Sequence, residues 1–171
     1  AASYDTRAFH ATEGGSQTVR LSNGVADLDH RGVGTIEWDA SWTVNFYGGF
    51  VPFTITDPTL TIAPDGTGTL TADLSGYASS MDDPTTKVEL DPVEDVVVST
   101  FSSIALAGAA GNTNLTVQPD FAGVEVEVSA EHAPQLRTVS GWGSWPQSFV
   151  DFQASTGLSS YWYTSGGSGD I

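Results

Sequence analysis

The sequence predicts an all-β protein, a two-sheet antiparallel β-sandwich with one or two short helices. The first observation is residues 35–46, in which every even position is apolar and every odd position is polar. Side chains on a strand point alternately to opposite faces, so one side of this segment enters a core and the other stays in water. The second observation is that several shorter alternating runs follow, separated by Gly, Pro, Asp and Asn, which favour turns.

The chain of 171 residues suits one domain, residues 1–171. We expect residues 1–34 to form an N-terminal strand, near Thr18–Leu21, within an extended polar segment. After the long strand 35–46, residues 50–55 predict an edge or bent strand, because Pro52 cannot donate to an interior ladder. Residues 59–62 and 69–74 then predict a hairpin around 63–68, where Pro64, Asp65 and Gly66 favour a turn.

The second half of the chain alternates less regularly. We expect a loop over 76–86 and strands at 87–90, 96–98, 115–117 and 124–128, the second of them continuing toward Leu106. A helix over 101–110 is the competing interpretation. We predict a helix from Pro146 through Gln153, since proline is tolerated in a first helical turn. Residues 158–163 predict a final strand, with Leu158 and Trp162 on one face and the two tyrosines 161 and 163 on the other.

The charge of the chain limits its partners. There are 21 acidic and five basic residues, which give a formal net charge of −16. Such a charge repels phosphate backbones and anionic lipids, so we expect no nucleic-acid partner. No apolar run approaches the ~20 residues that span a bilayer, so we expect no membrane span. The start Ala1-Ala2-Ser3 fits the end left by signal-peptide cleavage, which favours export.

The sequence offers little for catalysis. Cysteine is absent, and His10, His30 and His132 have no metal-ligand spacing. Neither a nucleophile elbow nor a phosphate-binding glycine loop is present. We therefore expect a protein that is not an enzyme and has no metal site.

Aromatic residues crowd between positions 142 and 163. Flat rings with a polar group can stack on a sugar, so Trp142, Trp145 and Trp162 are candidates for a glycan or partner surface. A tyrosine phenolate can ligate ferric haem, which makes Tyr163 and Tyr161 candidates for a haem site. Core packing of the rings and solvent-exposed phenols are the simpler alternatives.

Three segments read together resemble the HtaA domain of actinobacterial exported proteins. They are WDASWTVNFYGGFVPFTITDP from Trp38, GTLTADLSGYA from Gly68 and WPQSFVDF from Trp145. The resemblance covers most of residues 35–165. It implies a two-sheet β fold, an extracytoplasmic location at the cell envelope and, in haem-binding members, haem capture by a tyrosine that a histidine supports.

This chain departs from the haem-binding members at one position. Gly48-Gly49 stands where they carry Gly-His, so the supporting histidine is missing. Tyr163 lies near the family's carboxy-terminal tyrosine, and Tyr4 is the candidate near the amino end. The family's further strand after the aromatic segment implies a natural chain that continues beyond Ile171. We therefore expect an accessory or structural subunit that docks on an envelope or membrane-complex protein, with haem uptake, and haem as cofactor, as the first alternative and a glycan-binding module as the second.

Overall fold

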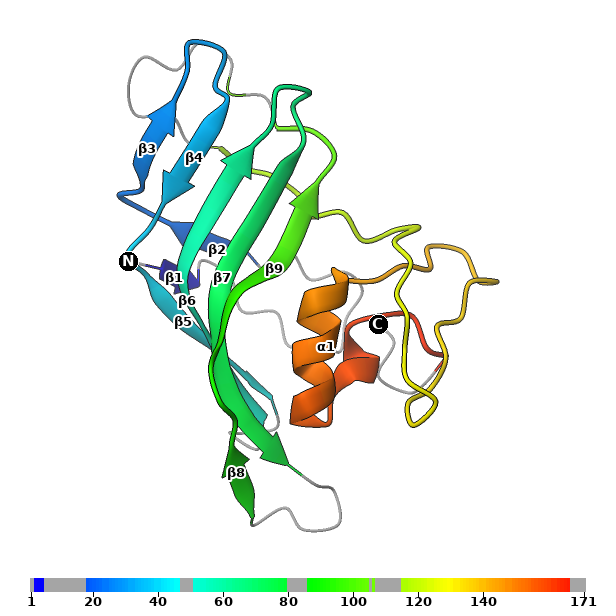
Figure 1. Cartoon of the computed structure of the whole chain (residues 1–171). Helices are drawn as coiled ribbons and strands as arrows, with labels where there is room; N and C mark the ends of the chain where they lie inside the picture. Colours follow the sequence, from blue (N-terminus) through cyan, green and yellow to red (C-terminus); the bar gives the residue numbers. More distant parts are fainter. Residues whose placement is uncertain are drawn as a thin grey trace.

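A computed structural model describes residues 2–4, 18–46, 51–79, 86–104, 106 and 115–166 (Figure 1). Gly48-Gly49 and residues 108–114, where the sequence predicts a turn between the strand that runs toward Leu106 and the strand 115–117, lie outside these ranges. The strands are β1 (Ala2–Tyr4), β2 (Val19–Leu21), β3 (Val25–Leu28), β4 (Gly34–Glu37), β5 (Ser41–Phe46), β6 (Val51–Ile62), β7 (Gly68–Ser79), β8 (Lys87–Glu89) and β9 (Val93–Phe101). The helices are α1 (Gln147–Thr156) and the short 3₁₀ helix η1 (Ser159–Tyr161).

Seven strands form one antiparallel sheet, and β1 and β2 pair separately. The long strands β6 and β7 are its centre and form the predicted hairpin, closed by the 63–67 turn. Strands β4 and β5 lie along the same edge of β6, while β8 and β9 lie along the opposite edge of β7. Pro52 precedes the first residue of β6 that pairs with β7, so its missing N–H removes no bond of that ladder.

The predicted strand 35–46 is interrupted and forms β4 and β5. The cause is a bulge in the neighbouring strand β6, where Asp57 has a positive φ of 48° and the register to β7 shifts between Thr56 and Thr59. The Trp38 N–H donates a hydrogen bond to the Pro58 carbonyl, so the chain between β4 and β5 stays bonded to β6 at the bulge. The even positions described from 36 to 44 still face the core side, so the predicted faces are confirmed although the single strand is not.

Helix α1 packs on one face of this sheet. It follows Pro146, as predicted, and runs to Thr156, three residues beyond the predicted end, before Gly157 ends it in a left-handed conformation with φ 86°. Phe149 and Phe152 enter the same core as Phe53 of β6. The ring of Phe53 meets both edge-on, at centroid distances of 5.8 and 6.4 Å. These aromatic contacts stabilise the packing of the helix on the sheet.

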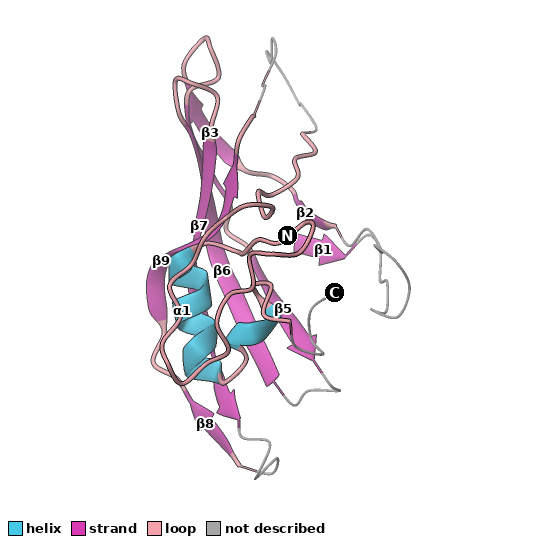
Figure 2. Cartoon of the chain, turned by 90° about the vertical axis from the view of Figure 1, so that its right-hand side faces the viewer, coloured by secondary structure: helices cyan, strands magenta, loops and turns pink. Residues whose placement is uncertain are grey.

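The second sheet of the predicted sandwich is not formed by the described residues. Figure 2 shows α1 and irregular chain in front of the sheet, and Leu115 and Val117 pack on the core cluster of Leu60 and Ile62. The fold is therefore mainly β and antiparallel, with a helix and loops as the covering layer. The other face of the sheet is polar, and the register aligns four threonines across four strands: Thr35, Thr61, Thr69 and Thr100.

The predicted strand 124–128 is not formed, and the backbone of this segment makes hydrogen bonds with side chains in place of a neighbouring strand. Gln135 accepts a hydrogen bond from the Val126 N–H (3.2 Å) and donates one to the Val124 carbonyl (2.8 Å). Gln147 makes the same two kinds of bond with the backbone of Glu127, at 2.8 and 2.9 Å. A carboxamide carries one acceptor and one donor group like a peptide unit, so these two side chains take the hydrogen-bonding place of a strand that the alternation did not reveal.

The predicted strand 158–163 is wrong. Residues 159–161 form η1, and only Tyr163 makes an isolated bridge, to Ser144. The 3₁₀ turn rotates the two tyrosines apart, so they do not share a face. At the other end of the chain the predicted strand near 18–21 is confirmed as β2, whereas β7 continues to Ser79, into the segment predicted as a loop. The helices in the described ranges are too short and too polar to cross a membrane.

Candidate docking groove between β9 and α1

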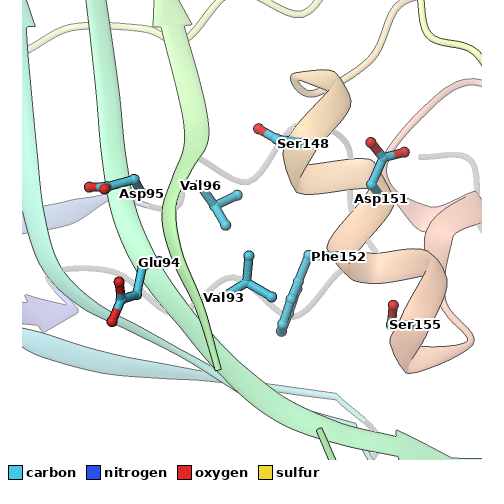
Figure 3. A pocket seen from close by; sticks show the side chains of 8 residues that line it. All are labelled: Val93, Glu94, Asp95, Val96, Ser148, Asp151, Phe152 and Ser155. Carbon is cyan, nitrogen blue, oxygen red and sulfur yellow. The ribbon is translucent and has the colours of Figure 1, made fainter. Parts of the chain in front are cut away.

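A groove of about 400 Å³ lies between the first half of β9 and helix α1 (Figure 3). The strand contributes Val93, Glu94, Asp95 and Val96, and the helix contributes Ser148, Asp151, Phe152 and Ser155. The four helix positions are three, four and seven residues apart, so they share one face of α1. A volume of this size is at the lower end of the range for small-ligand sites, about 300–1,000 Å³.

Ser148 holds the helix at the edge of the sheet. The Val97 N–H donates to the Ser148 Oγ at 3.1 Å, and this hydroxyl lies 3.2 Å from the Val97 carbonyl, to which it donates. The outward-facing backbone groups of Val97 are thereby occupied by one serine. Among the described residues, β9 pairs with β7 on one edge. Its other edge faces helix α1, and the groove lies between them.

A bulge in β9 shapes the strand side of the groove. Asp95 has a positive φ of 55°, and its N–H donates to the Asp73 carboxylate at 3.0 Å. The register between β7 and β9 shifts at this point, between Ala72 and Leu74. A bulge on an edge strand bends it and interrupts its ladder groups, which discourages an additional strand from pairing there. The groove therefore suits side chains better than an added strand.

The groove has an apolar centre, and the carboxylates of the strand that lines it lie outside the space between strand and helix. Figure 3 shows Val93, Val96 and Phe152 directed into the space between strand and helix, with the carboxylates of Glu94 and Asp95 directed away from the helix. Val93 is 45% exposed, as are several other valines of the described chain to a similar or larger extent, whereas Val96 and Phe152 are buried. Asp151, on the helix side, is exposed and accepts a hydrogen bond from Gln147 at 2.8 Å.

The carboxylates of the groove have no cationic partner in the described part of the chain. The ion pairs found there join Arg31 to Asp29 and Arg137 to Glu125, both away from the groove. The protein also has only five basic residues for 21 acidic ones. The negative charge at the groove is thus left uncompensated by intramolecular ion pairs.

The haem candidates are not brought together. Tyr163 is 2% exposed, and its hydroxyl donates a 2.7 Å hydrogen bond to the Ala133 carbonyl, so iron ligation would require this buried bond to break. Tyr161 is 37% exposed and lies on η1. Tyr4 lies on β1, opposite Val19 in the register. Among the described residues, neither the groove between β9 and α1 nor the hollow beside Trp38 is lined by Tyr161 or Tyr163.

The tryptophan candidates are also separated. Trp145 and Trp162 meet edge-on at 6.2 Å, and both pack against the core beneath α1. Trp162 also meets Phe149 edge-on at 4.8 Å. The Trp142 ring lies apart from them, with the Arg137 guanidinium 5.9 Å from its centre. Two of the three rings are therefore core elements, and the third has a cation over one face.

Sequence reasoning missed the groove. The spacing of Ser148, Asp151 and Ser155 already places these residues on one face of the predicted helix. The strand that forms the other side of the groove is about 50 residues away in the chain, so the sequence did not indicate that the two would meet. No protein-family model, curated protein sequence or solved structure matches this chain.

Proposed function

We propose that this protein is a non-catalytic, extracytoplasmic domain, similar to HtaA domains, that acts as an accessory or structural subunit docked on a larger cell-envelope assembly. The observation that carries the proposal is the groove between β9 and α1, in which Val93 is left 45% exposed beside a well-packed core. The hollow between a strand edge and a helix is a surface that a partner protein can cover.

Two further observations support docking over haem capture. The Tyr163 hydroxyl is used in a structural hydrogen bond to Ala133. Gly48-Gly49 replaces the histidine that supports the ligand in haem-binding relatives of the HtaA type.

Native electrophoresis of the envelope fraction from cells that produce the protein tests the proposal. After extraction with a mild detergent, the tagged protein is expected to migrate in a complex far larger than its own 17.9 kDa. In a denaturing detergent it is expected to migrate as a monomer. Migration as a monomer under mild extraction would contradict docking.

Titration with hemin is the parallel test of the haem alternative. We expect no saturable Soret band at one equivalent. If such a band formed and Tyr161→Phe or Tyr163→Phe abolished it in a folded variant, haem capture would replace docking as the function.

A further inference from the structure

We propose that Asn23-Gly24 is a site of spontaneous chemical modification, at which the asparagine cyclises onto the next backbone nitrogen and is converted to aspartate and isoaspartate. The sequence contains no second Asn-Gly pair. This pair lies in the exposed connection between β2 and β3, where Asn23 has a positive φ of 62°, a conformation that asparagine tolerates better than most residues. The inference concerns the chemical lifetime of the chain and is independent of docking.

The reaction needs only these two residues and water. The Gly24 nitrogen loses its proton to the solvent and attacks the side-chain carbonyl carbon of Asn23. A new C–N bond closes a cyclic imide, and the side-chain nitrogen takes up a proton and leaves as ammonia. Water then opens the imide at either carbonyl: cleavage at the side-chain carbonyl gives aspartate, and cleavage at the backbone carbonyl gives isoaspartate, in which the main chain runs through the side-chain carbons.

The fold leaves both reacting groups accessible. The ladder between β1 and β2 ends at Leu21, and the ladder between β3 and β4 begins at Val25. Among the described residues, no hydrogen bond holds the Asn23 side chain or the Gly24 N–H. The connection can therefore rotate into the geometry of attack without breaking a ladder bond, and glycine has no side chain to shield its nitrogen.

The turn at Asp65-Gly66 provides a contrast within the same chain, because an aspartyl or asparaginyl side chain there could form the same imide. The Asp65 carboxylate accepts hydrogen bonds from the Thr67 N–H at 3.0 Å and from the Thr67 hydroxyl at 2.8 Å. The Gly66 N–H donates to the Ala63 carbonyl at 3.0 Å. The group that is attacked and the nitrogen that attacks are both held in this turn, so the fold protects it.

The isoaspartyl product does not fit the native contacts of the connection. A Cβ built on Gly24 would lie 2.5 Å from the Trp38 Nε1 and 2.8 Å from the Ile36 Cγ2, so this glycine packs closely on both side chains. Isoaspartate inserts one more carbon into the main chain directly before Gly24. We therefore expect displacement of the Trp38 indole and weaker pairing at the start of β3, where Val25 lies opposite Glu37.

Peptide mapping by mass spectrometry follows the reaction in the folded full chain. Trypsin cleaves after Arg20 and Arg31 and releases the peptide 21–31, whose only asparagine is Asn23. During incubation at neutral pH in water enriched in heavy oxygen, we expect this peptide to lose its amide, to gain the label and to elute as two isomers. The rate should rise in proportion to hydroxide concentration, because the attacking nitrogen must first lose its proton.

Matched variants separate the chemistry from the fold. Asn23→Gln lengthens the side chain, so ring closure becomes unfavourable and the modification of peptide 21–31 should disappear. Asp65→Asn creates an Asn-Gly pair in the turn held by Thr67 and Ala63, and we expect this pair to lose its amide more slowly than Asn23 in the same folded molecule. In urea, where the turn is unfolded, both pairs should react at similar rates.

The Trp38 indole N–H signal in NMR spectra reports the structural effect. It should shift in parallel with isoaspartate formation and stay unchanged in Asn23→Gln. The inference is wrong if the Asn23 amide persists in the folded chain while it is lost in urea, or if conversion occurs without uptake of heavy oxygen. Equal rates at the two Asn-Gly pairs of folded Asp65→Asn would refute the role of the fold, and an unshifted Trp38 signal in converted protein would refute the displacement.

Discussion

Replacement of Gln135 by leucine tests the idea that a side-chain amide takes the place of a β-strand. The Gln135 carboxamide makes three hydrogen bonds to backbone groups, with Val126, Val124 and Gly143, at 3.2, 2.8 and 3.1 Å. Leucine has a similar size but neither donor nor acceptor, so the Val126 N–H and the Val124 carbonyl would lose the bonds made by Gln135, and the Gly143 carbonyl would keep the bond from the Thr164 N–H. The segment 124–128 would then keep the hydrogen bonds of Glu127 with Gln147 and of the Val126 carbonyl with Arg137.

The expected cost follows from those bonds. Each typical intramolecular hydrogen bond contributes about 0.5–1.5 kcal/mol net, so three amount to roughly 1.5–4.5 kcal/mol. Gln135 is half-buried, and water can reach part of the vacated space, which places the expected loss at about 2–3 kcal/mol. For a chain of this size that lowers the melting temperature by about 4–12 °C.

Urea and thermal unfolding, followed by tryptophan fluorescence, measure this loss. The control is Gln118→Leu, which makes the same chemical change at an exposed position and is expected to alter stability by less than about 0.5 kcal/mol. Hydrogen exchange at the Val126 amide should accelerate in the Gln135 variant. A Gln135→Leu protein as stable as the control, with unchanged exchange at Val126, would refute the structural role of the carboxamide.

Three other changes have defined outcomes. Gly143→Ala places a Cβ against the Phe121 carbonyl, a backbone atom that cannot move aside, so we expect poor folding, judged by near-UV circular dichroism. Phe53→Ala removes the ring that joins β6 to α1 and should cost about 3–5 kcal/mol in urea unfolding, whereas a cost below about 1 kcal/mol would contradict its central place in the core. The Thr67 N–H and hydroxyl lower the pKa of Asp65 from its ordinary value of 3.8, so this carboxylate stabilises the fold above 3.8 and the contribution disappears as the pH falls through the lowered pKa. Melting curves at neutral pH and well below 3.8 should therefore show a smaller acid-induced loss in Asp65→Asn than in the unmodified protein, and an equal loss would contradict the assignment.

The local patterns of the sequence predicted single elements well where one face of a strand is buried. The even positions from Ile36 to Val44 face the core as the alternation indicates, and the 63–67 turn joins β6 and β7. Pro146 begins the helix. The pattern could not show that the strand breaks at 38–40, because the cause is the bulge at Asp57 in another strand.

The aromatic segment shows the same limit for the candidate site. Alternation placed Tyr161 and Tyr163 on one face, but the turn of η1 exposes the first and buries the second. The hydrogen bond from Tyr163 to Ala133 joins residues 30 positions apart, and nothing near Tyr163 in the sequence indicates it. The groove depends likewise on Ser148 reaching Val97.

The amino-acid sequence by itself determined the β-rich, antiparallel character, the position of the helix and the strong negative charge, since these depend on neighbouring residues and on composition. The tertiary structure alone decided that a helix and loops cover the sheet, which tyrosine is buried, and where exposed aliphatic surface meets carboxylates. The physical reason is that burial and hydrogen-bond partners are set by contacts between distant segments, and the same alternating pattern is compatible with a neighbouring strand, a glutamine side chain or a helix as the partner.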